Sequence, residues 1–235
     1  MKEKECRPYI ICHMVTSIDG KVTGNYLSND KIKPSIDLYY KMHKDFNFDG
    51  FICGRVTMES SFTNYRKEDL SIFKNKKINR EDYIGKLGNF YAVSFDRYGK
   101  VFWDNNTIFD EDEGYNNSVI IEVLTEKVSD EFLCYLQSKN ISYIFAGIDD
   151  IDVNIALNKL KTLFNINKLL LEGGSIINGV FLKSNCVDEL SLVIAPINGQ
   201  KEDKPLFYEG DINTFNLINA KSIGQSVYVR YLKDE

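Results

Sequence analysis

An acidic residue and two adjacent glycines interrupt an apolar stretch late in the chain, in the order Glu172-Gly173-Gly174-Ser175. The apolar run 168–171 before them is typical of a buried strand, and the pattern after them predicts a helix over 175–183. Glycine lets the backbone approach an anion closely, and a helix start offers free N–H groups and the positive end of its dipole. The motif is either a phosphate-binding turn or an ordinary strand–helix turn, and the residues alone leave both open.

Glycines and polar side chains also follow three other predicted strands, at residues 9–15, 49–54 and 89–95. They are Ser17, Asp19 and Gly20 after the first strand, Gly54, Arg55 and Thr57 after the second, and Ser94, Arg97 and Lys100 at the third. An arginine fork or a hydroxyl can bind a phosphate oxygen, but Asp-Gly is also a common turn and Thr57 can cap a helix. Because ligands of open α/β sheets bind beyond the carboxyl ends of the strands, we expect all four turns to share one rim.

Strands and helices alternate along the chain, which implies right-handed crossovers and a mainly parallel sheet with helices on both faces. Further strands are predicted at 118–125 and 141–147, and further helices at 34–46, 130–140 and 151–164. In the last of these helices, the residues near helical spacing are Ile151, Ile155, Leu157, Leu160 and Phe164. Two apolar segments joined around Gly224-Gln225 predict a C-terminal hairpin, so the fold class is α/β with an antiparallel edge on a mixed sheet.

The composition is that of a globular protein, with 235 residues, 43% hydrophobic and 27% charged. The net charge of −5 argues against broad nucleic-acid binding, which needs a basic field. Without a run of eighteen apolar residues or a secretory pattern at the start, we expect no membrane span and a cytoplasmic protein. Five scattered cysteines and two histidines give no metal-ligand spacing, so we expect reduced cysteines and no bound metal.

The four glycine-containing stretches resemble the dihydrofolate-reductase-like fold. They look more closely like the reductase, C-terminal domain of bifunctional riboflavin-biosynthesis proteins, the RibD C-terminal domain family. "MVTSIDGKVTG" is similar to that family's M-S-x-D-G-K/R, and "GRVTMES" to the G-R-x-T-x-E-S of dihydrofolate reductases. Residues 169–197 resemble the family's E-G-G … D-E-L … P block. The resemblance implies one three-layer reductase domain over residues 1–235, with the charged segment 61–88 as an insertion or a lid.

The resemblance also implies NADPH as the cofactor. It implies that Arg55, Thr57 and Ser94 hold the 2′-phosphate and that the first turn covers the nicotinamide. Gly173 and Gly174, often joined by a cis peptide in the family, would lie under the pyrophosphate and nicotinamide. The full set of implied cofactor-binding residues is Thr16, Ser17, Gly20, Gly54, Arg55, Thr57, Ser94, Gly173, Gly174 and Ser175.

Glu172 is implied to border the substrate, and it shares with Asp19 the expected catalytic role of orienting substrate or water. Asp37, on the first helix, corresponds to the acid that assists proton delivery in dihydrofolate reductases and is a further substrate-binding candidate. Riboflavin reductases help to hold the ribose phosphate with a D-x-P segment after the third turn, and the corresponding region here, "ESSFTNYR", has no such triplet. The zinc-binding deaminase half is also absent from the sequence.

The resemblance therefore favours an NADPH-dependent reductase similar to 5-amino-6-(5-phosphoribosylamino)uracil reductase, acting on a pyrimidine- or pterin-like small molecule. One alternative is a reductase of a different substrate, such as a pterin, a carbonyl compound or a nitro compound. Another is a non-enzymatic nucleotide-binding module on the same fold. The family commonly forms dimers, and the apolar C-terminal strands could pack against a second copy, so a homodimer is expected.

Overall fold

The computed structural model describes residues 6–43 and 45–234, and the chain divides into two compact units. Unit 1 contains Asp49–Asn167 and the described residues up to Pro8, whereas unit 2 contains Tyr9–Phe48 and the described residues from Lys168 onward. The interpretation of residues 1–235 as one reductase domain stays a prediction. No helix in the described ranges is both long and apolar enough to cross a membrane.

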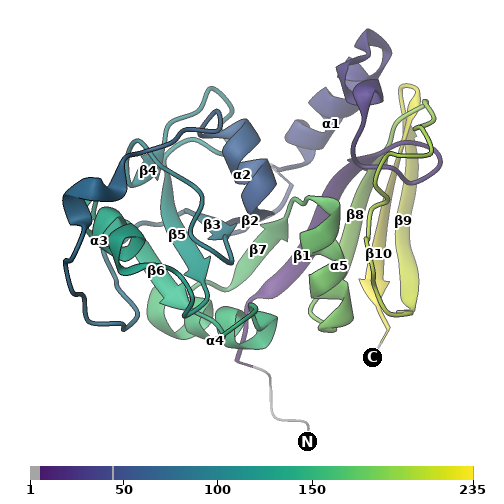
Figure 1. The fold of residues 1–235 in the computed structure, drawn as a ribbon. Coiled ribbons are helices and arrows are strands. Elements are labelled where there is room, and N and C mark those ends of the chain that lie inside the picture. Colours follow the sequence, from purple (N-terminus) through teal and green to yellow (C-terminus); the bar gives the residue numbers. More distant parts are fainter. Residues whose placement is uncertain (1–5, 44, 235) are drawn as a thin grey trace, which may run out of the picture. The chain divides into compact units, whose positions relative to one another are not determined.

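The sheet of unit 1 is built from parallel strands with one short antiparallel strand at its edge. In spatial order β2 (Gly50–Gly54), β3 (Tyr91–Phe95), β5 (Ser118–Leu124) and β6 (Ser142–Phe145) run parallel, and β4 (Thr107–Ile108) pairs antiparallel with β5. The helices of this unit are α2 (Arg55–Ser61), α3 (Asp130–Ser138) and α4 (Val153–Phe164), with a short 3₁₀ helix at Leu70–Phe73 (Figure 1). This is the mainly parallel arrangement predicted from the alternation of strands and helices.

Aromatic residues cover the two faces of the unit 1 sheet. Tyr91 on β3 packs against Phe164 of α4, with ring centroids 5.8 Å apart. Phe51 on β2 lies on the opposite face, because it pairs with Ala92 rather than with Tyr91, and it contacts Phe62 just after α2 at 5.6 Å. Alternate residues of a strand point to opposite faces, so each face acquires its own apolar layer.

Unit 2 carries the antiparallel edge. Its strand order is β7 (Lys168–Leu171), β1 (Tyr9–Thr16), β8 (Glu189–Ile194), β10 (Ser226–Lys233) and β9 (Phe215–Ile223). The first three strands are parallel, and β10 and β9 form the predicted hairpin. The helix α5 (Ser175–Lys183) lies in front of β1 and β8 in Figure 1, and α1 (Lys33–His43) packs on the other face, where His13 stacks on Tyr39. The predicted fold class, a mixed and mainly parallel α/β sheet with an antiparallel C-terminal edge and helices on both faces, is confirmed.

The prediction of which residues form the buried face of α4 was wrong in the first turn of the helix. The helix begins at Val153, because Asp152 caps it by accepting from the N–H groups of Asn154 and Ile155 at 2.8 and 3.2 Å. Ile151 therefore precedes the helix, and Ile155 is 43% exposed. The buried residues of the helix are Val153, Ala156, Leu157, Leu160 and Phe164.

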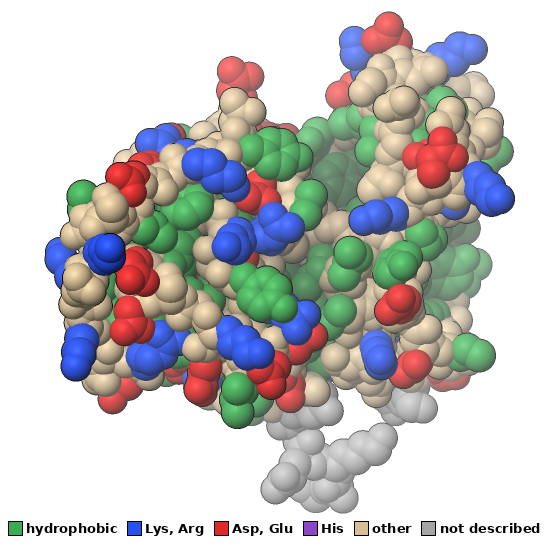
Figure 2. Space-filling model, in the orientation of Figure 1, with side chains coloured by type: hydrophobic (Ala, Val, Ile, Leu, Met, Phe, Trp, Pro, Cys, Tyr) green, Lys and Arg blue, Asp and Glu red, His purple; other side chains and the backbone are tan. Residues whose placement is uncertain are grey.

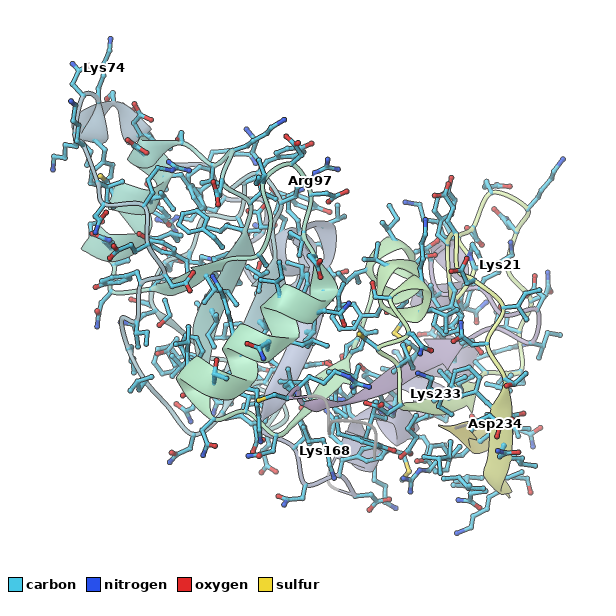
Figure 3. The ribbon with its side chains drawn as sticks, turned by 90° about the horizontal axis from the view of Figure 1, so that it is seen from below. Lys21, Lys74, Arg97, Lys168, Lys233 and Asp234 are labelled. Carbon is cyan, nitrogen blue, oxygen red and sulfur yellow. The ribbon has the colours of Figure 1, made fainter. Side chains whose placement is uncertain are left out.

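The charged segment 61–88 is attached to unit 1 at several points. The main chain of Tyr83 forms an antiparallel bridge with Tyr143 of β6, and Asp82 accepts from the N–H of Phe145 at 2.9 Å. Arg80 donates to the carbonyl of Val128 at 2.9 Å. Figure 3 shows Lys74, within the segment, at the opposite end of unit 1 from Arg97, which follows β3. The roles of insertion or lid stay predictions.

Two carboxyl groups are buried side by side in the core of unit 1. Glu122 on β5 pairs in register with Ser94 on β3, and Asp96 follows two residues later on the same face. All three residues have no exposed surface. Burial raises the pKa of Glu122 well above its usual value, and the nearby charge of Asp96 raises it further; the indole N–H of Trp103, at 2.5 Å, opposes the shift. Burial likewise raises the pKa of Asp96, and the hydrogen bonds that its carboxylate accepts from the N–H groups of Val101 and Lys100 oppose this shift.

We expect Glu122→Gln to stabilise the protein at neutral pH by roughly 1–3 kcal/mol, the usual cost of a buried polar group without full compensation. The amide keeps an acceptor for Trp103 and carries no charge. In the wild type, the folded chain binds more protons than the unfolded chain above the ordinary glutamate pKa, so stability falls as the pH rises toward the folded-state pKa. Urea unfolding at several pH values should show the variant's advantage growing with pH, whereas a constant difference would contradict this assignment.

Candidate active site

The turns after β1 and β7 are brought together in unit 2. The segment from Pro205 to Leu206 links them, because the Ser175 hydroxyl donates to the carbonyl of Pro205 and the N–H of Leu206 donates to the carbonyl of Gly20 at 2.9 Å. Lys21 forms an isolated bridge with Pro205, and its ammonium group, labelled in Figure 3, donates to the carbonyl of Asp203 at 2.9 Å. The two glycine motifs of this unit therefore meet at one edge of the sheet. The prediction that all four turns share one rim stays a prediction.

The first turn is held rigidly by its own side chains. The hydroxyl of Ser17 donates to Asp19 at 2.6 Å and accepts from the N–H of Lys21 at 2.8 Å. Asp19 also accepts from the N–H of Gly199 at 2.8 Å, and these donors, Gly199 first and Ser17 second, lower the pKa of Asp19. Gly20 has a φ of +75° and open space where a Cβ would stand. The side chains of Ser17 and Asp19 shape the turn, and Gly20 leaves its surface bare.

The second turn contains the cis peptide bond that the family resemblance implied, between Gly173 and Gly174. Gly173 has a φ of +93°, and a Cβ there would stand 3.2 Å from the terminal methyl of Met14 on β1. Gly174 precedes α5 and offers no side chain to cap it. Ser175 is 2% exposed, and its hydroxyl donates to the carbonyl of Pro205. The groups of this turn that remain for a ligand are therefore the backbone N–H groups at the start of α5.

Glu172 is buried immediately before this turn. Its side chain is 2% exposed, and Oε1 lies 2.7 Å from Nε2 of His43 at the end of α1. The strands β1 and β7 pair up to Cys12 and Leu171, so His13 and Glu172 come next on the two neighbouring strands. Burial raises the pKa of the Cys12 thiol, and the charge of Glu172 adds to this effect.

His13 is a buried neutral ring beside this carboxylate. Burial lowers the pKa of His13 from 6.5 to about 4, although the charge of Glu172 opposes the shift. Nε2 of His13 lies 3.2 Å from the carbonyl of Tyr39. Nδ1 lies 2.9 Å from the hydroxyl and 3.2 Å from the carbonyl of Ser191, and the hydroxyl oxygen of Ser191 lies 3.2 Å from the hydroxyl of Tyr228. Both ring nitrogens of His13 are therefore committed to the fold.

The predicted residues of unit 1 also follow parallel strands, but they are differently engaged. Gly54 ends β2 and precedes α2. Arg55 forms an ion pair with Glu59, which is buried and also lies 3.2 Å from Lys67. Thr57 is half-buried within α2 rather than at its cap, and Ser94 is in the core beside Glu122.

The two remaining predicted residues differ in burial, because Thr16 is 3% exposed and Asp37 is exposed. Thr16 is the last residue of β1, and its carbonyl accepts from the N–H of Ala195 at 2.7 Å. Asp37 is on the exposed face of α1. The buried face of the same helix carries Tyr39 and His43.

The sequence interpretation missed His43 and the segment 198–206. One available signal was that His43 stands four residues after Tyr39, which places both on one face of a helix. Segment 198–206 has no periodicity, and only the folded contacts of Gly199 and Pro205 show its part in the turn. Among the described residues, no group of three or more His, Cys, Asp or Glu side chains could hold a metal ion.

The surface shown in Figure 2 mixes basic and acidic groups. In unit 1, Lys127 pairs with Asp149, and Arg97 lies 3.3 Å from Asp150.

On unit 2, exposed apolar residues gather on the C-terminal hairpin, namely Leu217, Ile218, Ile223, Val227 and Leu232. The expected homodimer stays a prediction, for which this hairpin is the natural surface.

Comparison with protein families gives a match over almost the whole chain. The family model described as the RibD C-terminal domain matches residues 8–229. No relative is found among curated protein sequences.

Solved structures show the same fold at low identity. A pyrimidine reductase-like protein from Corynebacterium diphtheriae is 19% identical, with a TM-score of 0.66 over 97% of this chain and 92% of that protein. The Saccharomyces cerevisiae riboflavin biosynthesis reductase Rib7 is 18% identical, with a TM-score of 0.60 over 100% and 93%. The Thermotoga maritima diaminohydroxyphosphoribosylaminopyrimidine deaminase/5-amino-6-(5-phosphoribosylamino)uracil reductase is 19% identical, with a TM-score of 0.61. The match covers 97% of this chain but only 57% of that longer protein.

Proposed function

The chain belongs to the family of RibD C-terminal domains, and from this we propose that it is an NADPH-dependent reductase of a pyrimidine-like substrate. The substrate class is that of 5-amino-6-(5-phosphoribosylamino)uracil, which is named for the similar Thermotoga maritima protein. The observation that carries the proposal is the meeting of the turns after β1 and β7, with Glu172 buried at their base. The family match by itself does not identify which residues of this chain would lie beside the nicotinamide and the substrate.

The residues of unit 2 fit a reduced nicotinamide nucleotide. The uncapped start of α5 and the bare surface at Gly20 leave backbone N–H groups and space for an anionic group. When bound, the nicotinamide would supply the hydride. The chain's own contribution is placement: Ser17 and Asp19 keep the first turn in shape, and the Glu172 carboxylate would bind or orient a polar group of the substrate.

Turnover of the proposed substrate tests this function directly. When the protein is mixed with NADPH and 5-amino-6-(5-phosphoribosylamino)uracil, the absorbance of the reduced nicotinamide should fall as NADPH is oxidised. Glu172→Gln should lower the rate of this oxidation. A panel containing a pterin, a carbonyl compound and a nitro compound covers the alternative reductases. Turnover of a panel member alone would replace the proposed substrate, and binding of NADPH without any turnover would favour a nucleotide-binding module.

Arg55→Ala is expected to weaken the binding of NADPH much more than that of NADH, by about tenfold if the guanidinium contacts the 2′-phosphate. The side chain of Arg55 is 41% exposed, so donors beyond those used for Glu59 can reach a ligand. Lys67→Ala is the matched control, since Lys67 contacts the same Glu59 carboxylate. Equal losses for both nucleotides would show that Arg55 acts only through Glu59.

A further inference from the structure

The ring of His43 is fixed by the aromatic residues around it. His43 is the last residue of α1, and its side chain is 3% exposed. Its ring centroid lies 4.9 Å from that of Tyr39, 5.3 Å from that of His13, 5.8 Å from that of Tyr40 and 6.1 Å from that of Phe48. All four pairs are edge-on, the arrangement that aromatic rings prefer. Such packing leaves the imidazole little freedom to turn.

The ring nitrogen of His43 faces the carboxylate that ends β7. Nε2 lies 2.7 Å from Oε1, which is within ion-pair distance. A carboxylate that is 2% exposed is costly unless a donor or an opposite charge meets it. Glu172 directly precedes Gly173, so its carboxylate is the acidic group next to the proposed nicotinamide turn. A contact that fixes this side chain therefore fixes an acidic group of the proposed site.

His13, although adjacent to Glu172, does not take this role. Its Nε2 is directed at the carbonyl of Tyr39 and its Nδ1 at the hydroxyl of Ser191. Its contact with His43 is a ring contact at 5.3 Å. The imidazole that meets the carboxylate is therefore the one supplied by α1.

We propose that His43 is a positioning residue for Glu172: its ring holds the orientation of the carboxylate that borders the proposed substrate site. The catalytic part of this inference rests on the proposed function. The contact between the two side chains does not, because it can be measured in the protein without substrate or cofactor. The buried face of α1 would act on the proposed site through the contact of His43 with Glu172, without contact between His43 and the substrate.

The contact is tested first by imidazole nitrogen NMR on the free protein. The chain has only two histidines, so the spectrum contains two rings, and His43→Gln identifies one of them by its loss. Glu172→Gln should move the Nε2 resonance of His43 strongly. Glu189→Gln is the matched control, because Glu189 is a buried glutamate of the same sheet that contacts Arg230 instead. A change no larger than in this control would overturn the proposal.

Kinetics with the turned-over substrate tests the effect on catalysis. We expect His43→Leu to lower kcat by about tenfold or more, with a smaller effect on KM, and to have almost no effect in the Glu172→Gln background. His43→Gln, whose amide can still donate, should recover most of kcat. Undiminished kcat in His43→Leu, or a His43→Gln variant as impaired as Glu172→Gln, would overturn the positioning role.

The two tests separate the possible failures. If the wild type turns over no substrate, the proposed function fails while the NMR result still decides the contact. If His43→Leu does not fold, His43→Gln and the NMR comparison decide the proposal. Lys41→Ala, at an exposed position of α1, should leave both kcat and the two imidazole signals unchanged.

Discussion

Replacing His43 with leucine is expected to lower the free energy of unfolding by about 3–5 kcal/mol, because it leaves a buried carboxylate without its partner. The two side chains are 3% and 2% exposed, and the atoms that face each other are 2.7 Å apart. Urea unfolding at neutral pH measures the loss. It is among the largest effects that a single substitution in unit 2 should produce, since most substitutions cost less.

The double variant His43→Leu/Glu172→Leu is the control for this prediction. Replacement of a whole buried pair by apolar residues is often neutral or stabilising, so the double variant should regain most of the lost stability. A double variant as unstable as His43→Leu would indicate that the imidazole stabilises the fold through its ring contacts with Tyr39 and Tyr40 rather than through Glu172.

Acidification from pH 7 to pH 4 is expected to remove about 3 kcal/mol of stability through His13. The pKa of this ring falls from 6.5 to about 4, first because of its burial and also because of His43. Between these values the unfolded chain binds a proton that the folded chain does not, so the stability present above pH 6.5 is lost as the pH falls. The effect is opposite in direction to that of Glu122.

The variant His13→Gln isolates this contribution. Glutamine can donate to the carbonyl of Tyr39 and accept from Ser191, but it does not titrate. Unfolding curves at several pH values should show a flatter decline toward acid in His13→Gln than in the wild type. Parallel curves for the two proteins would mean that the fold does not lower the pKa of His13.

Local patterns predicted the elements of the fold closely. The strand 168–171 and the helix 175–183 have the predicted bounds. The start of α4 was wrong because Asp152, the second residue of the predicted helix, caps the helix, which therefore begins at Val153. Side-chain capping decides such boundaries, and an apolar pattern does not encode it.

The site was predictable only in part. Strand ends and glycines predicted the turns at Gly20 and Gly173, because parallel strands bring such turns to one edge. The hydrogen bonds that join them run through Pro205 and Leu206, which lie in a segment without periodicity. His43 and Glu172 are far apart in the sequence and meet only after folding, so their contact could not be predicted from either motif.

The central claim, that the turns after β1 and β7 receive a reduced nicotinamide nucleotide, is tested most directly by fluorescence titration of NADPH. The variants to compare are Gly20→Asn and Gly224→Asn. Both glycines have positive φ and open space at the Cβ position, and asparagine tolerates that conformation. Gly224 is in the hairpin turn between β9 and β10, and β8 separates this hairpin from β1 in the sheet.

The wild type and Gly224→Asn should bind NADPH with the same affinity, and Gly20→Asn should bind it about tenfold or more weakly. Absence of binding in the wild type, or equal binding by all three proteins, would contradict the account.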